Sequence, residues 1–169
     1  MKGTKGLWLG YGGQAKELMG YADADGSMSE DRKAISGYAF MINSRAIPWS
    51  TKRQELISLS MTESEYIAAT YVAKKALWLQ AIISQLFSIQ LDATTLFSNN
   101  QSTIALEHQY HACTKHIDIH FHFIRWIVKE GKIQLIYCPI EEMVAGTLTK
   151  VLPSTKVKNF AKELSLVPY

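Results

Sequence analysis

The chain of 169 residues contains little cysteine and no long hydrophobic run. Two cysteines, Cys113 and Cys138, are too few for a disulfide framework and favour a reducing compartment, although a single bridge between them stays open. No apolar stretch reaches the roughly 18 residues that a membrane-spanning helix requires, so we expect no membrane association. The basic residues at the start precede no apolar segment of signal-peptide length. We therefore predict an intracellular protein, cytoplasmic or nuclear.

A strong excess of charge of one sign is also missing. The formal net charge is +3 and the pI is near 8.8. This balance permits a polyanionic partner such as nucleic acid but does not require one. With 47% hydrophobic and 20% charged residues, the chain has the composition and length of one globular domain with a sizeable core.

Hydrophobic patterning divides the chain into a short tail and one domain. Residues 1–18 are glycine-rich and are predicted to be a tail with a short strand at LWLGY, whereas residues 19–169 are predicted to form the domain. Alternating apolar residues predict three strands, at ELMGYADAD, SGYAFMI and AIPWSTK. Asn43 and Ser44 are predicted to form the turn between the second and third of these strands.

Helical periodicity follows from about residue 62 to residue 87, where Thr62 and Glu65 have the spacing of a capping box. The predicted apolar face of this helix consists of Ala68, Val72, Ala76, Leu79, Ile83 and Leu86. The remaining predicted elements are a strand at TTLFSN, helices at NQSTIALEHQ and IDIHFHFIRWIVKE, a strand at KIQLIYCPI, and helices at MVAGTLTKVL and TKVKNFAKELS. A three-strand meander followed by alternating helices and strands predicts an α/β fold with a mixed sheet.

Acidic residues supply the first candidates for chemistry. Asp23 and Asp25 are two positions apart on a predicted strand, which places both carboxylates on one face and favours a metal ion between them. The alternative is that Asp25 belongs to the following turn. Glu65 lies in the first turn of the long helix, where the helix dipole and capping already explain a carboxylate without any function.

Histidines and basic residues give weaker signals. Cys113, His116 and His120 have C-x2-H-x3-H spacing that suggests zinc, but no second ligand pair accompanies them, and a helix with an exposed histidine face is the simpler interpretation. Lysine and arginine are scattered, as on a solvated surface. Aromatic residues interleaved with cations such as Lys52 and Arg53 nevertheless leave room for a nucleic-acid-binding face.

Several motifs, taken in order, resemble the ribonuclease H domain of copia-type LTR retrotransposon polyproteins. They are YADAD, DRKAISGYAFMINSRAIPWSTKRQELISLSMTESEYIAA, ALWLQAII, LFSNNQSTIAL, TKHIDIHFHFIR and AGTLTKVLP. The similarity covers about residues 19–153, and KGTKGLWL resembles the end of the preceding reverse transcriptase region. The resemblance implies an RNase H-like fold, with a five-stranded mixed sheet whose first three strands are antiparallel. It also implies hydrolysis of the RNA strand of RNA/DNA hybrids with two Mg²⁺ or Mn²⁺ ions.

The resemblance assigns four acidic positions, and this sequence fills only two of them. The first acid corresponds to Asp23 in YADAD and the second to Glu65 in TESEYIAA. The third, in a pattern Asp-Asn-Gln-Ser, is Asn99 here, and the fourth, in a pattern Ala-Asp-x-Leu-Thr-Lys, is Gly146. Asparagine offers a neutral oxygen and glycine offers no side-chain ligand. We therefore expect Asp23 and Glu65 to bind metal weakly or not at all.

Other acids nearby are an alternative source of ligands, namely Asp25, Glu141 and Glu142. Their misplacement relative to the four expected positions argues against a rescue. The prediction is thus an RNase H-like domain of retroelement origin, a degenerate or domesticated copy with impaired or absent nuclease activity. The alternatives are a non-catalytic module that binds nucleic acid or an unknown protein, and a structural domain docked to a reverse transcriptase. Predicted nucleic-acid contacts are Lys52, Arg53, Asn100 and Gln101.

Overall fold

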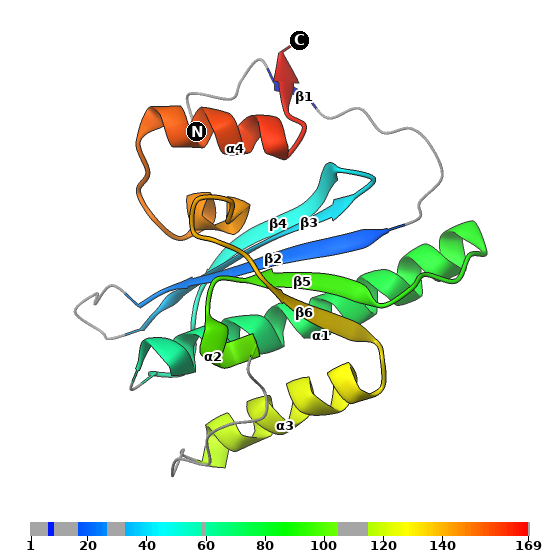
Figure 1. Ribbon diagram of the computed structural model, residues 1–169, viewed down its shortest axis with the longest axis vertical. Helices are drawn as coiled ribbons and strands as arrows, with labels where there is room; N and C mark the ends of the chain where they lie inside the picture. The colour runs from blue at the N-terminus through cyan, green and yellow to red at the C-terminus, as the bar shows by residue number, and fades with distance from the viewer. Residues whose placement is uncertain (1–6, 9–16, 27–32, 59, 105–114, 169) are drawn as a thin grey trace.

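A computed structural model describes residues 7–8, 17–26, 33–58, 60–104 and 115–168 of the chain, with the arrangement drawn in Figure 1. The strands are β1 (Leu7–Trp8), β2 (Leu18–Asp25), β3 (Ile35–Ile42), β4 (Arg45–Arg53), β5 (Thr94–Ser98), β6 (Ile133–Tyr137) and β7 (Val167–Pro168). The helices are α1 (Met61–Phe87), α2 (Gln101–Ile104), α3 (Lys115–Lys129), the 3₁₀ helix η1 (Val144–Leu148) and α4 (Ser154–Glu163).

Five strands form one mixed sheet in the order β4-β3-β2-β5-β6. β2, β3 and β4 pair antiparallel, whereas β5 runs parallel to β2 and β6 runs parallel to β5. This is the predicted α/β architecture, so the fold class is confirmed. The parallel pairing places Ser98 beside Ala22. The carboxyl ends of β2 and β5 therefore lie next to each other at one edge of the sheet, which brings residue 99 close to residue 23.

The turn between β3 and β4 was predicted correctly. Asn43 and Ser44 have φ angles of 50° and 60°. A two-residue hairpin whose central residues both have positive φ matches the right-handed twist of its strands, and asparagine tolerates this conformation better than most residues. The turn sets the register in which Tyr38 lies opposite Ser50 and Ala39 lies opposite Trp49.

Helix α1 begins one turn differently from the prediction. Its N-cap is Ser60, whose side-chain oxygen accepts a hydrogen bond from the backbone N–H of Glu63 at 3.2 Å. The cap predicted from Thr62 and Glu65 is therefore wrong, because Thr62 already lies inside the first turn. The predicted apolar face is buried from Ala68 to Ile83, but Leu86 is 72% exposed because the end of α1 extends beyond the sheet.

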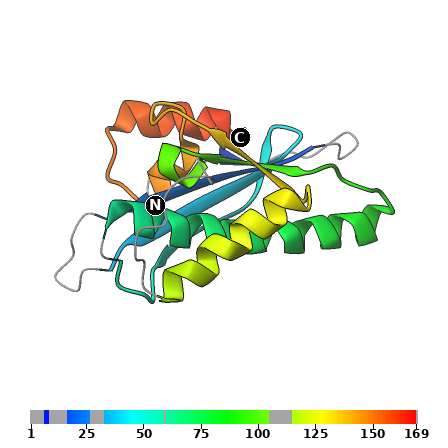
Figure 2. The ribbon, with the colours of Figure 1, turned by 60° about the horizontal axis from the view of Figure 1, so that its bottom comes forward.

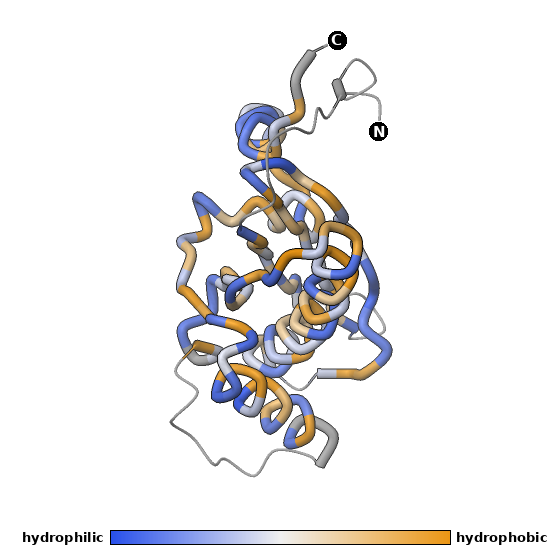
Figure 3. Tube along the Cα trace, turned by 90° about the vertical axis from the view of Figure 1, so that its right-hand side faces the viewer, coloured by the Kyte–Doolittle hydropathy of each residue, from blue (hydrophilic) through white to orange (hydrophobic). Residues whose placement is uncertain are grey.

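Helices cover both faces of the sheet. α1 and α3 lie on one face, and η1 and α4 lie on the other (Figures 1 and 2). The main core, between the sheet and α1, includes Phe40, Val72, Leu96 and Ile127. The opposite face has a smaller core, in which Phe160 is the buried residue of an otherwise largely hydrophilic α4 (Figure 3).

The segment after β6 differs from the helix predicted at MVAGTLTKVL. It contains only the short 3₁₀ helix η1, followed by extended chain up to Pro153. Glycine at position 146 weakens a helix interior, and the residue before a proline disfavours helical backbone. The helix predicted at NQSTIALEHQ is described only as α2, since residues 105–114 lie outside the described part. Among the described helices, none combines the length and apolar character needed to cross a membrane.

Candidate metal centre

Asp23 lies at the centre of the candidate site and is 0% exposed. It lies opposite Gly37 in the β2–β3 pair, so both residues point to the face that η1 covers. A Cβ atom added to Gly37 would lie 2.7 Å from Cγ2 of Thr149 and 3.0 Å from Cβ of Leu148. The glycine therefore lets the end of η1 approach the sheet closely enough to reach Asp23.

Three hydrogen-bond donors converge on the carboxylate of Asp23. Thr149 Oγ1 donates to Oδ2, and Asn99 Nδ2 donates to Oδ1 at 3.2 Å. The ammonium of Lys150 lies 3.0 Å from the same Oδ1, and the Lys150 side chain is 31% exposed. Both oxygens of Asp23 are thus satisfied from within the protein, and its negative charge is balanced by Lys150.

Glu65 approaches from the first turns of α1 and is 5% exposed. Burial, and then the negative charge of Asp23, raise the pKa of Glu65 to about 8, although Lys150 and a hydrogen bond from the backbone of Ala24 act in the opposite direction. Without a bound cation, Glu65 is therefore mainly protonated at neutral pH. The two carboxyl groups that the sequence predicted as metal ligands are brought together by the fold, but they carry close to one negative charge between them.

The two positions that lack an acid are also adjacent to this centre in the structure. Asn99 directly follows β5, and its Oδ1 is buried without a hydrogen-bond partner while Nδ2 contacts Asp23. Gly146 is buried in η1, and a Cβ atom added there would have nothing within 4 Å. The space for a side chain at residue 146 is therefore present, although the side chain is not.

The alternative acids do not join the centre. Glu141 and Glu142 are exposed in the turn before η1. The charge of Glu142 acts instead near Cys138, a buried free thiol whose pKa is raised to about 11 first by burial and then by Glu142 and Glu163. Asp25 is half-buried at the end of β2. Within the described residues, no group of three histidine, cysteine, aspartate or glutamate side chains is placed to hold a metal ion.

The side chains present do not fit a pair of divalent ions. Two such ions bring four positive charges, whereas the centre offers Asp23, a mainly protonated Glu65 and the neutral Oδ1 of Asn99 as ligands. A cation at Asp23 would also lie next to the ammonium of Lys150. No catalytic step through bound metal follows from these residues.

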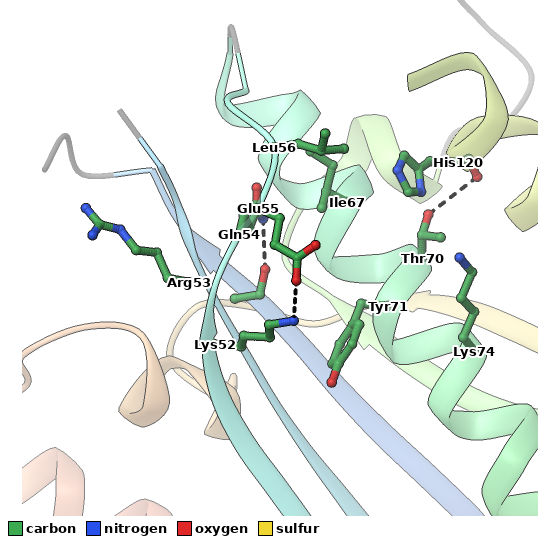
Figure 4. Close-up of a pocket in the computed structure, with 11 residues that line it drawn as sticks. Lys52, Arg53, Gln54, Glu55, Leu56, Ile67, Thr70, Tyr71, Lys74 and His120 are labelled. Atoms are coloured by element: carbon green, nitrogen blue, oxygen red, sulfur yellow. Dashed lines mark hydrogen bonds and ion pairs between the residues drawn. The ribbon is translucent and has the colours of Figure 1, made fainter. Parts of the chain in front are cut away.

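The predicted nucleic-acid contacts fall into two groups. Asn100 and Gln101 lie at the start of α2 beside the centre, where Asn100 Oδ1 accepts a hydrogen bond from the Thr103 N–H at 3.2 Å and so caps the helix. Lys52 and Arg53 lie at the end of β4. Their side chains extend to opposite sides of the strand (Figure 4).

Sequence reasoning missed Thr149 and Lys150 as partners of Asp23. The available signal was their position directly after Gly146 in AGTLTK, one of the motifs that carried the resemblance. The C-x2-H-x3-H spacing falls mostly outside the described residues, which include neither Cys113 nor the side chain of His116. For His120, the backbone oxygen accepts a hydrogen bond from Thr70 Oγ1 at 3.4 Å.

Comparison with known proteins gives sequence relatives and structural neighbours, while no protein-family model matches the chain. The chain is 38% identical over 167 residues to the retrovirus-related Pol polyprotein from transposon TNT 1-94 of Nicotiana tabacum, an alignment that covers 97% of this chain and 12% of the polyprotein. It is 28% identical over 157 residues to the corresponding polyprotein from transposon RE1 of Arabidopsis thaliana, covering 91% and 11%. The chain thus spans only a small fraction of the polyproteins that it matches.

Two solved structures share the fold. The N-terminal RNase H domain of Rv2228c from Mycobacterium tuberculosis superposes with a TM-score of 0.57 at 10% identity, covering 88% of this chain and 98% of that one. LC11-RNase H1, solved in complex with an RNA/DNA hybrid, gives a TM-score of 0.53 at 14% identity, covering 78% and 91%. At these identities the similarity establishes the fold alone.

Proposed function

The chain belongs to the family of retrovirus-related Pol polyproteins and has the fold of ribonuclease H domains, and from this premise we propose that it binds RNA/DNA hybrids but hydrolyses them poorly or not at all. One observation carries the loss of hydrolysis. Both oxygens of Asp23 are engaged by Thr149, Lys150 and Asn99, and neither residue 99 nor residue 146 supplies a further acid.

The charge of the centre supports this proposal. In the family that the chain resembles, four carboxylates hold two divalent ions, and hydrolysis depends on both ions. Here Lys150 neutralises the one fully buried carboxylate, Asp23. The retained acids therefore support the fold of the centre rather than a nuclease reaction. The cofactor of the family, Mg²⁺ or Mn²⁺, is accordingly proposed to bind weakly or not at all.

Hybrid binding is supported by the fold and by the position of α2. A protein with this fold has been solved with an RNA/DNA hybrid. The predicted contacts Asn100 and Gln101 lie at the same edge of the sheet as Asp23, where a hybrid would have to lie for its RNA strand to reach the centre. An intracellular location, as predicted from the sequence, is part of this proposal.

A cleavage assay with restored acids tests the loss of hydrolysis. An end-labelled RNA/DNA hybrid is incubated in Mg²⁺ and in Mn²⁺ with the native protein and with the double variant Asn99→Asp, Gly146→Asp. The open space at Gly146 accommodates the new side chain. We expect cleavage by the double variant only. The matched control, Asn99→Asp with Gly146→Asn, fills the same space without the second charge and should stay inactive.

Two results would count against the proposal. Robust cleavage by the native protein would show that two acids suffice. Failure of the native protein to bind the hybrid in a fluorescence anisotropy titration at low salt, where phosphate contacts are strongest, would remove the nucleic-acid-binding part. That second result would favour a domain that docks on a protein such as a reverse transcriptase.

A further inference from the structure

A cavity of about 280 Å³ lies on the face of the sheet opposite to the one that Asp23 points to. It is formed by the end of β4 and the segment after it, by the N-terminal half of α1, and by His120 of α3 (Figure 4). Its size is slightly below the roughly 300–1,000 Å³ of typical small-molecule sites. The cavity therefore suits one nucleotide-sized group rather than a folded partner.

Gln54 gives this cavity an unused hydrogen-bond acceptor. The residue lines the cavity and is 6% exposed. Its Nε2 donates to Ser36 Oγ and to the backbone oxygen of Ser64, both at 2.8 Å, and these bonds fix the amide. Its Oε1 is buried and has no hydrogen-bond partner. Since buried polar atoms are normally satisfied, a ligand with an N–H or O–H donor would complete this site.

The charge around the cavity favours an anionic ligand. Lys52 and Lys74 line it, and the acid there, Glu55, is already paired with Lys52 at 2.8 Å. The hydrogen bond and charge of Lys52, followed by the charge of Lys33, lower the pKa of Glu55. Helix α1 has no acidic residue after Glu65, whereas Lys74 and Lys75 lie near its middle.

Aromatic rings continue the cationic surface along α1. Tyr71, Lys74, Lys75 and Trp78 follow each other at intervals that place them on one side of the helix. Tyr71 is 41% and Trp78 is 51% exposed. The ammonium of Lys75 lies 3.8 Å from the centre of the Trp78 ring, and the Tyr71 ring packs against Tyr38 at 5.8 Å. Exposed rings flanked by lysines are the usual platform for stacked bases and their phosphates.

We propose that the cavity and the surface formed by Tyr71, Lys74, Lys75 and Trp78, together called the α1 groove, bind single-stranded nucleic acid. Bases stack on the two rings, phosphates lie near the lysines, and a 2′-hydroxyl or base amine donates to Gln54 Oε1. This contact goes beyond the proposed hybrid site, because it lies on the other face of the sheet. It rests on the proposed function only in taking nucleic acid as the ligand.

Matched variants on the two faces of the sheet test the proposal. Labelled single-stranded RNA and DNA oligonucleotides are titrated by fluorescence anisotropy at low salt. We expect Trp78→Ala to weaken binding about tenfold through the loss of stacking. The control is Trp49→Ala, because Trp49 has nearly the same exposure, 48%, and pairs with Ala39 on the opposite face. Binding by this control should stay unchanged.

Charge reversal provides an independent arm. Lys74→Glu with Lys75→Glu should weaken binding and reduce the slope of log K against log salt by about two, one for each lost phosphate contact. The control pair is Lys156→Glu with Lys158→Glu, since both lysines are exposed on α4 across the sheet. In addition, bound oligonucleotide should quench tryptophan fluorescence in the native protein and much less in Trp78→Phe. Circular dichroism confirms that each variant is folded.

The outcomes separate this inference from the proposed function. Equal binding by Trp78→Ala and Trp49→Ala, or no binding of either oligonucleotide at low salt, overturns the α1 groove as a nucleic-acid site and leaves its exposed rings to a protein partner. Hybrid binding that persists in that case keeps the proposed function. Single-strand binding that depends on Trp78 supports the inference even if the hybrid fails to bind.

Discussion

The two halves of the candidate centre differ in what they have kept. β2 and α1 supply Asp23 and Glu65, which are 0% and 5% exposed and have defined contacts. The end of β5 and η1 supply Asn99 and Gly146, which lack the charge that the resemblance leads one to expect. The backbone nevertheless places all four positions at the same edge of the sheet.

This difference indicates that the centre has lost charge without losing its architecture. Asn99 still contacts Asp23 at 3.2 Å, and the space at Gly146 is still open. In place of divalent ions, the ammonium of Lys150 balances Asp23. The structural role of the first half and the missing charge of the second half can therefore be tested separately.

The largest effect is expected from removing Asp23. Asp23→Ala leaves Lys150 without its anion and Thr149 and Asn99 without their acceptor, and breaking a buried ion pair in this way lowers the free energy of unfolding by about 3–5 kcal/mol. Because Lys150 is 31% exposed, the lower end of that range is expected. Urea unfolding followed by circular dichroism measures the loss.

Asp25→Ala is the control, since Asp25 is only half-buried at the end of the same strand. Its loss should stay within about 1 kcal/mol, in the range of ordinary partly exposed substitutions. Equal losses for both variants would contradict the central role of Asp23 in the fold.

Glu65 should make the stability depend on pH. Its pKa is about 8 in the folded protein because of burial and the charge of Asp23, against 4.5 for the ordinary side chain. A raised pKa of an acid means that the folded state retains a proton that the unfolded state has lost. This contribution is complete below pH 4.5 and disappears as the pH rises through 8, and it amounts to a few kcal/mol at most.

The comparison is between the native protein and Glu65→Gln, unfolded with urea at pH 5 and pH 8.5. The glutamine mimics the protonated acid and does not titrate. The native protein should therefore lose more stability than the variant between these two pH values. Parallel losses would mean that Glu65 ionises freely inside the fold.

Metal binding should distinguish the native centre from the restored one. In thermal unfolding with and without Mg²⁺, the native protein should show almost no shift of Tm. The variant Asn99→Asp, Gly146→Asp should be stabilised by about 2.7 kcal/mol when the free Mg²⁺ concentration is 100 times Kd. A clear Mg²⁺-dependent shift in the native protein would show that Lys150 does not prevent binding.

Much of the fold could be predicted from the sequence because its signals are local. Alternating residues and the Asn43–Ser44 turn located β2, β3 and β4, and the helical period located α1. The pairing of β5 with β2 joins residues far apart in the chain, so its expectation came from the family resemblance. The burial of Leu86 was predicted wrongly because periodicity does not reveal where the sheet ends.

The candidate centre was only partly predictable for the same reason. The resemblance identified the four positions, including the two without acids. It did not identify Lys150 as the partner of Asp23, because that contact depends on how closely η1 approaches β3 at Gly37. The pKa of Glu65 likewise depends on burial, which a sequence pattern cannot measure. Local capping also misled, since both Ser60 and Thr62 have a suitable glutamate three residues later.

The smallest predicted effect concerns that cap at the start of α1. Ser60 accepts the hydrogen bond from the Glu63 N–H, so Ser60→Ala should lower the free energy of unfolding by about 1 kcal/mol. Thr62→Ala removes a side chain within the first turn and should change it by less than about 0.5 kcal/mol. Urea unfolding of both variants under the same conditions measures the difference. A larger loss for Thr62→Ala would restore the capping box that the sequence first indicated, and would place the start of the helix that carries Glu65 two residues later.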